Sequence, residues 1–275
     1  DASGLRDDQL ARLTYDWDVT NDFAVSVTGY LHEDEGQGIW FTPYVSPFSF
    51  GQGGPNVSPI SVRTTEYDMN RSGVLGHATW QLGDHKIEGG FWYEYNDFNQ
   101  DRRFYANTRQ APRDSLKFMR NPFATQWSYG YDFETTMFYL QDTWDITDAL
   151  TIELGGRYTH ERKRFFQQAI RNESGAPLLA GTPSYRLAES WNNFSPRASL
   201  SYDLADNAML YASWTRGFRS GGFNGRPTSL EEVGSYDPET LTAWEMGIKT
   251  EPSHGFTFNV SAFRNNYRNQ QLLIT

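Results

Sequence analysis

The chain has 275 residues, and its 24 Lys and Arg against 34 Asp and Glu give a net charge of -10, which argues against a nucleic-acid binder with its basic footprint. Only 38% of the residues are hydrophobic, and no apolar run reaches the ~18 residues of a membrane-spanning helix. An aromatic content of 16% excludes a disordered chain, and the absence of cysteine excludes disulfide bonds and thiolate metal sites.

Apolar and polar residues alternate with a period of two along much of the chain, the pattern of a β-strand with two different faces. Residues 133–146 and 150–159 alternate in this way around Thr147-Asp148-Ala149, which predicts a hairpin with a tight turn. A similar unit surrounds Thr20 and Asp206, and looser turns fall near residues 84 and 253. The ten predicted strands are 9–18, 22–35, 66–82, 86–104, 131–146, 150–168, 190–204, 208–218, 240–251 and 256–270.

The connections between these hairpins are long and rich in Gly, Pro, Asn and Ser; they cover residues 36–65, 105–130, 169–189 and 219–239. Short and long connections therefore alternate strictly, as they do in outer-membrane barrels, which have tight periplasmic turns and long outer loops. The strands are also longer than those of most soluble sheets. The sequence predicts an all-β protein with an antiparallel transmembrane β-barrel architecture.

The two faces of the predicted strands differ as lipid requires. Val260 and its alternate neighbours are apolar, whereas Ser261 and its alternate neighbours are polar. An Arg or Lys facing lipid at mid-depth costs about 2 to 4 kcal/mol, so the polar face is predicted to line a wet lumen. The charged lumen-lining candidates are Glu153, Arg157, Arg197, Glu245 and Lys249. Asp142 lies on the apolar face, so we expect it near the membrane interface, or else the register slips there.

Large aromatic residues stand beside four of the tight turns, at Trp17, Trp80, Trp144 and Tyr202. Half-wet aromatic rings suit the girdle at a membrane interface, and the alternative is that they are ordinary core aromatics.

Two segments together resemble the TonB-dependent outer-membrane receptors: residues 211–225, YASWTRGFRSGGFNG, and residues 236–249, YDPETLTAWEMGIK. The resemblance implies a 22-stranded barrel whose lumen is filled by an N-terminal plug domain, preceded by a short box that contacts TonB. Neither plug nor box is visible here. We therefore expect residues 1–275 to be about ten strands of a larger receptor barrel, although ten strands could also close alone.

The resemblance also implies a function. Such receptors sit in the bacterial outer membrane, among lipid and lipopolysaccharide, and import a scarce ligand, most often a ferric siderophore, with energy supplied by TonB through the plug. No bond is made or broken, so no enzymatic activity, catalytic residue or cofactor is expected. The alternatives are a passive porin and a soluble all-β enzyme or carbohydrate-binding protein. Other chelates, heme, cobalamin and oligosaccharides are also family cargoes, so the ligand stays open.

Residues in the predicted outer loops are the cargo-binding candidates, because guanidinium groups and aromatic faces suit anionic, flat-ringed ferric chelates. The alternative is that they pack one loop against another. The first loop contributes Trp40, Phe41, Tyr44, Phe48 and Phe50, and the second contributes Arg219, Phe223, Asn224 and Arg226.

The remaining polar motifs predict no catalytic or metal site. The five histidines are scattered, and the adjacent pair Glu231-Glu232 is not opposed across a cleft. The run His32-Glu33-Asp34-Glu35 could chelate a divalent cation, but a solvated loop edge is the favoured interpretation. Arg162-Lys163-Arg164 is assigned to the outer rim, facing lipopolysaccharide phosphates or a wet loop.

Overall fold

The computed structural model describes residues 3–107, 118–167, 185–224 and 233–272, and almost all of them form long strands. Two short strands, β9 (Gly222–Phe223) and β10 (Ser235–Tyr236), pair with each other, and η1 (Pro47–Phe50) is a single 3-10 turn. The long strands are β1 (Ser3–Asp18), β2 (Phe23–Thr42), β3 (Ser61–Leu82), β4 (His85–Tyr105), β5 (Ala124–Thr147), β6 (Leu150–Gln167), β7 (Tyr185–Ala205), β8 (Ala208–Arg219), β11 (Glu239–Ser253) and β12 (Phe256–Arg268).

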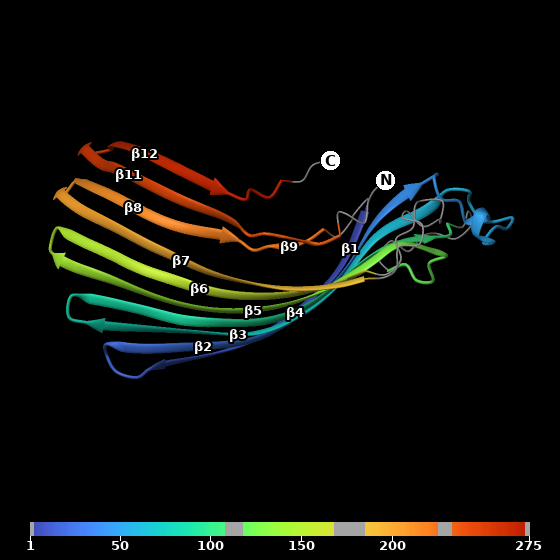
Figure 1. The fold of residues 1–275 in the computed structure, drawn as a ribbon, viewed down its shortest axis with the longest axis horizontal. Coiled ribbons are helices and arrows are strands. Elements are labelled where there is room, and N and C mark those ends of the chain that lie inside the picture. Colours follow the sequence, from blue (N-terminus) through green and yellow to red (C-terminus); the bar gives the residue numbers. More distant parts are fainter. Residues whose placement is uncertain (1–2, 108–117, 168–184, 225–232, 273–275) are drawn as a thin grey trace.

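The long strands form one ten-stranded antiparallel sheet in the order β1-β2-β3-β4-β5-β6-β7-β8-β11-β12. Figure 1 shows this sheet as a curved wall, with the five hairpin turns gathered at one end and the long connections toward the other. Two turns depend on glycine, because Gly83 and Gly255 have φ values of 60° and 78°. The predicted strands, turns and antiparallel architecture are confirmed. Among the described residues, no helix is long and apolar enough to cross a bilayer.

The long connections are shorter than predicted, because the strands continue into them. Thr42 still pairs with Ser61, so the first connection runs only from 43 to 60, and β5 begins at Ala124. In these extensions polar residues occur on both faces, so the hydrophobic alternation fades while cross-strand hydrogen bonding persists. The prediction that Trp40 and Phe41 lie in a loop is therefore wrong; both belong to β2.

The strand registers hold the predicted faces across the sheet. Leu154, Ala198, Trp214 and Trp244 are successive partners on one face. Asp142 lies on that same face and pairs in register with Leu154, so the register does not slip at this position. His85, which follows a tight turn, places Nδ1 2.9 Å from Asp142 Oδ2. The carboxylate is thus paired close to the turn end of the sheet.

Candidate functional site

The charged residues predicted to line a lumen all lie on the face opposite Leu154. Arg197 forms an ion pair with Glu153 and donates from Nη1 to Gln141 Oε1 at 3.3 Å. Arg157 lies on the same face, in register with Tyr139. These side chains give the face both positive and negative charge in the half of the strands nearer the tight turns.

The last two charged candidates, Glu245 and Lys249, meet at one tyrosine on the same polar face. Tyr211 Oη donates to Glu245 Oε1 at 2.6 Å, and Lys249 Nζ lies 5.2 Å from the centroid of the Tyr211 ring. A charge-assisted hydrogen bond and a cation–π contact thus hold both charges against β8. That the polar face lines a lumen stays a prediction.

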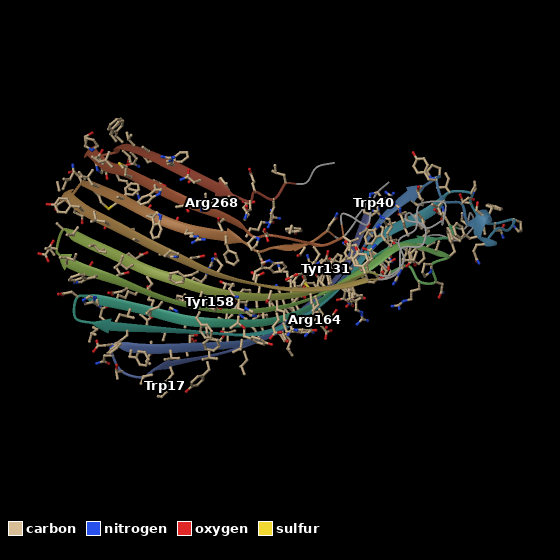
Figure 2. The ribbon with its side chains drawn as sticks, viewed as in Figure 1. Trp17, Trp40, Tyr131, Tyr158, Arg164 and Arg268 are labelled. Carbon is tan, nitrogen blue, oxygen red and sulfur yellow. The ribbon has the colours of Figure 1, made fainter. Side chains whose placement is uncertain are left out.

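The four girdle candidates share the apolar face and flank the tight turns. Trp80 packs edge to face on Phe23 with 6.4 Å between ring centroids, and Trp144 stacks on His85 at 5.1 Å. Trp17 and Tyr202 pair in register with Val25 and with Leu150 and Leu210 respectively. Figure 2 labels Trp17 near the turn end of the sheet, far from Tyr131, which lies toward the long connections. Their contact with a membrane interface stays a prediction.

A cluster of aromatic residues occupies the polar face at the end nearer the long connections. Phe165 is buried and pairs in register with Tyr131 on one side and Leu187 on the other. Its ring lies 4.8 Å from that of Tyr131 and 5.8 Å from that of Phe223. We call this group the inner aromatic cluster, and its members are Trp127, Tyr129, Tyr131, Phe165, Tyr185, Leu187, Trp191 and Phe223.

Two cations lie over the inner aromatic cluster. Arg102 is 5.2 Å from the centroid of the Trp127 ring, and Lys163 Nζ is 5.5 Å from that of Trp191. Lys163 also donates to the backbone oxygen of Gly221 at 2.8 Å and pairs with Glu161 at 3.2 Å. One ammonium group therefore ties the segment after β8 to the wall, and positive charge faces aromatic rings, which suits flat anionic ligands.

The hydroxyl of Tyr185 provides a hydrogen-bond donor at the edge of the cluster. Burial raises the pKa of Tyr185 to about 12, so its hydroxyl stays protonated well above neutral pH. It donates to Gln167 Oε1 at 2.6 Å. Tyr185 is therefore a fixed hydrogen-bond donor beside the rings.

The predicted cargo residues between 219 and 226 differ in their surroundings, since one is buried against the sheet and another is exposed. Phe223 is 5% exposed and lies inside the inner aromatic cluster, so it packs its connection against the sheet. Arg219 is the exposed last residue of β8 and pairs in register with Glu239. Asn224 follows β9 and is half-buried, and Arg226 lies outside the described residues.

The first set of predicted cargo residues lies in another part of the sheet. Trp40, in β2, has the guanidinium of Arg63 5.7 Å from its ring centroid. Phe50 packs against Phe123, whereas Tyr44 and Phe48 are exposed. Phe41 is also exposed, on the other face of β2. Five strands lie between β2 and β8, so these two sets of residues do not form one compact site at the level of the strands.

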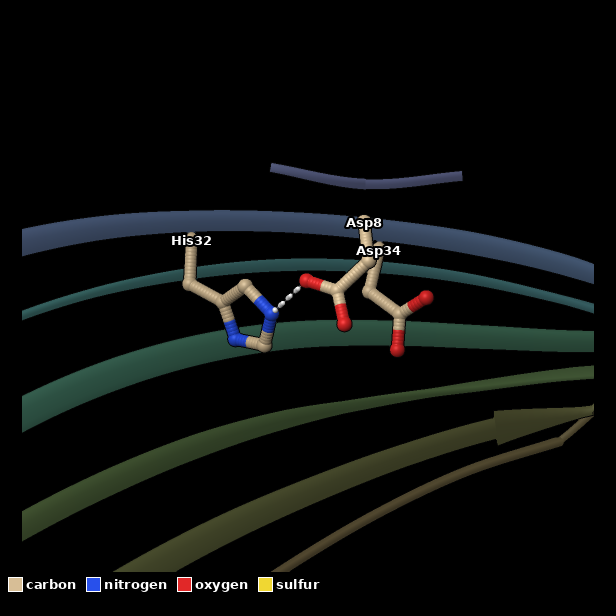
Figure 3. A group of neighbouring side chains, drawn as sticks. All are labelled: Asp8, His32 and Asp34. Carbon is tan, nitrogen blue, oxygen red and sulfur yellow. Dashed lines mark hydrogen bonds and ion pairs between the residues drawn. The ribbon is translucent and has the colours of Figure 1, made fainter. Parts of the chain in front are cut away.

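The acidic run at residues 32–35 lies inside β2, so its interpretation as a solvated loop edge is wrong. Buried His32 and Asp34 meet Asp8 of β1, with their ligand atoms within 4.8 Å of one another. His32 Nε2 is 2.8 Å from Asp8 Oδ1 (Figure 3), and Arg6 pairs with both carboxylates. Arg71 Nη2 also lies 2.8 Å from His32 Nδ1. The guanidinium groups of Arg6 and Arg71 therefore already offset the negative charge of the two carboxylates.

Sequence reasoning missed the inner aromatic cluster because it placed residues 105–130 in a loop. The signal was present, since Trp127, Tyr129, Tyr131 and Phe133 are aromatic residues spaced by two. That spacing puts all four on one face of an extended strand. It identifies a continuous aromatic stripe in β5 that no loop would keep aligned.

The chain matches the family model described as TonB dependent receptor-like, beta-barrel, over residues 1–275. Its fold is similar to that of the ferric yersiniabactin uptake receptor FyuA from Yersinia pestis, with 15% identity, a TM-score of 0.66, and coverage of 97% of this chain and 36% of that one. The unliganded ferric citrate transporter FecA gives 18% identity and a TM-score of 0.62 over 96% of this chain and 35% of FecA. The copper transporter OprC is 15% identical, with a TM-score of 0.63 over 94% of this chain and 38% of OprC.

Proposed function

The chain belongs to the TonB-dependent receptor β-barrel family, and from that premise we propose that it forms part of the wall of an outer-membrane receptor that imports a ferric siderophore. The chain spans little more than a third of the solved structures it resembles, 36% for FyuA and 35% for FecA. TonB contact is made through a plug region outside this chain. The wall itself positions cargo and performs no chemistry on it.

The observation that carries the proposal is the inner aromatic cluster with its two cations. Ferric chelates with aromatic ligand groups offer flat rings and negative charge, and Lys163 and Arg102 lie over Trp191 and Trp127. The cluster lies on the polar face, toward the long connections, where a ligand arriving from outside meets the barrel first. Because Lys163 also holds Gly221, cargo that displaces this contact would release the connection after β8.

Replacing Lys163 with glutamine in the full-length receptor is expected to weaken binding of an anionic ferric siderophore by about tenfold, the effect of losing one desolvated cation–π and charge contact. Quenching of tryptophan fluorescence by a panel of ferric chelates measures the affinity. Arg162→Gln is the matched control, because it removes the same charge from the adjacent position on the opposite face. Equal affinities for the two variants would count against this binding site.

A passive pore is the remaining alternative, and energy coupling separates it from gated import. Uptake of radiolabelled ferric chelate into cells that carry the receptor is expected to stop when TonB is deleted. Uptake that persists without TonB would instead support an open channel.

The proposed orientation places the tight turns in the periplasm and the long connections outside. Single cysteines at Asp148 and Asp206, in tight turns, are therefore expected to be protected from an impermeant maleimide on intact cells. A cysteine at Gly53, between β2 and β3, is expected to react. Labelling after lysis controls for reactivity at all three positions, and the reverse pattern would overturn the orientation.

A further inference from the structure

The apolar face of the sheet becomes charged toward the long connections, and its charge changes sign across the sheet. Strands β1 to β5 carry carboxylates there, whereas β6 and β7 carry guanidinium groups. Arg103, on the acidic side, is already paired with Glu66 and Asp101. We call the remaining set the outer charged patch, and its members are Asp7, Glu33, Glu35, Asp68, Asp97, Asp132, Glu134, Arg162, Arg164 and Arg186.

Two carboxylates and two guanidinium groups meet where the charge of the patch changes sign, at the border between β5 and β6. Asp132 pairs in register with Arg164, and Glu134 lies opposite Arg162. Arg164 Nη1 is 3.6 Å from Asp132 Oδ2 and 49% of the Arg164 side chain is exposed, so this ion pair is open to solvent. Arg162 is exposed, and no residue that the structure describes forms an ion pair with it. Both arginines can therefore bind a further carboxylate.

This border lies just beyond the span of a bilayer. Arg162 and Arg164 are twelve and fourteen residues beyond Leu150, the first residue of β6 after a tight turn. About 9 to 11 tilted residues cross the hydrocarbon, so in the proposed orientation both guanidinium groups lie on the outer side of it. Adjacent strands are about 4.8 Å apart, so a strand tilt of about 40° separates Asp132 and Arg164 in height by only about 3 Å.

The order of the charges suits contact with a second copy of the same surface. Two copies in one membrane are inserted in the same direction, so a two-fold axis that relates them runs along the membrane normal. Rotation about this axis keeps every height and brings β5 of one copy opposite β6 of the other. Asp132 then faces Arg164 of the second copy, and Arg164 faces its Asp132. Glu134 and Arg162 form the same reciprocal contacts one row below.

We propose that the outer charged patch joins two copies of the receptor side by side in the outer membrane, with a two-fold axis at the border between β5 and β6. The choice of a second copy rests on charge complementarity. A cationic partner would meet the arginines and a phosphate-bearing lipid would meet the carboxylates, whereas a second copy satisfies both signs at once. The outer sides of two barrels are convex, so the contact is a narrow strip and the dimer is expected to be reversible. It does not depend on the identity of the cargo.

The test places fluorescently labelled full-length receptor in phosphatidylcholine vesicles and measures energy transfer between copies as the ratio of protein to lipid rises. Arg164→Glu and Asp132→Lys are each expected to weaken self-association at least about tenfold, because the two-fold axis repeats every repulsive contact. A mixture of the two variants is expected to associate as well as wild type. In the mixture the new carboxylate faces the new ammonium group, and the native pair is kept at the second contact.

Arg268→Glu is the matched control, because it makes the same change of charge twelve residues beyond a tight turn, on β12 and well away from Arg164 (Figure 2). It is expected to associate as wild type does. Raising the salt concentration from about 0.05 M to about 1 M is expected to weaken wild-type association, because salt screens exposed charges.

Three results would overturn the proposal. The first is wild-type association that is absent or insensitive to salt, and this measurement requires no variant to assemble. The second is failure of the mixed variants to associate, since a defect in folding alone would not be repaired by mixing. The third is loss of wild-type association when lipopolysaccharide is added to the vesicles, which would assign the arginines to lipid phosphates instead.

Discussion

Replacing Val260 with arginine is expected to prevent most of the receptor from assembling in a bilayer. Val260 is the fifth residue of β12 after the tight turn and shares the apolar face with Ile248 and Leu210. It therefore lies near the middle of a span of about 10 residues, where an arginine facing lipid costs about 2 to 4 kcal/mol. A loss of this size is a large fraction of the stability of a typical folded protein.

The matched control is Ser261→Arg, one residue further along the same strand. Ser261 pairs in register with Gly247 on the polar face, beside Tyr211 and Glu245, where a cation gains a partner. The heat-shifted gel mobility of the full-length receptor folded into vesicles measures the assembled fraction of each variant. If both variants assembled to the same extent, the assignment of the two faces would be wrong.

Replacing Gly90 with alanine is expected to destabilise the centre of the sheet by about 1 to 3 kcal/mol, the usual cost of overpacking. A Cβ at this position would overlap the backbone oxygen of Gly76 and lie 2.6 Å from Cε1 of Tyr139. Gly90 pairs with His77 on one side and with Tyr139 on the other, so the strand cannot move aside without breaking two ladders. Because one obstacle is backbone, a rotamer change cannot remove the overlap.

Gly217→Ala in β8 is the control for this change, since no other atom lies within 4 Å of the added Cβ. It is expected to be neutral or to stabilise the protein by up to ~1 kcal/mol, because alanine loses less conformational freedom on folding. Urea titration of the two variants in vesicles compares their stabilities. A Gly90 variant as stable as the Gly217 variant would show that the two central ladders tolerate more displacement than the packing indicates.

The hairpins and faces could be predicted from sequence because apolar and polar residues alternate along each strand. Val260 and Ser261 differ by one position and lie on opposite faces of β12, so their pattern is visible without a structure. The turns could be predicted as well, because a short segment of similar sequence interrupts the alternation near Thr20, Asp148 and Asp206. For Asp142 the pattern left two alternatives, a place near the membrane interface or a slip of register, and the observed pairing with Leu154 removes the slip. Its partner His85 comes from another hairpin and could not be identified.

The parts of the chain above the apolar band were harder to predict, because neither face there needs to be apolar. Glycine and proline between residues 36 and 65 indicated a loop, yet the β2–β3 ladder continues up to Thr42 and Ser61. Contacts between residues far apart in the sequence were beyond reach, because they depend on how the connections fold. Phe223 reaches Phe165 only through a connection that folds back onto β6.

The length of β5 has a mechanical consequence for whatever approaches the cell. At about 3.4 Å per residue, its 24 residues extend about 80 Å, and at a tilt of about 40° they rise about 60 Å. An apolar band accounts for only about 25 Å of that rise. In the proposed orientation, an antibody or a phage tail would therefore meet a stiff collar of paired backbone before it met lipid. Variants that escape the antibody or the phage are expected to change side chains on that collar. Altering the length of a strand would instead shift its hydrogen-bonding register with both neighbouring strands.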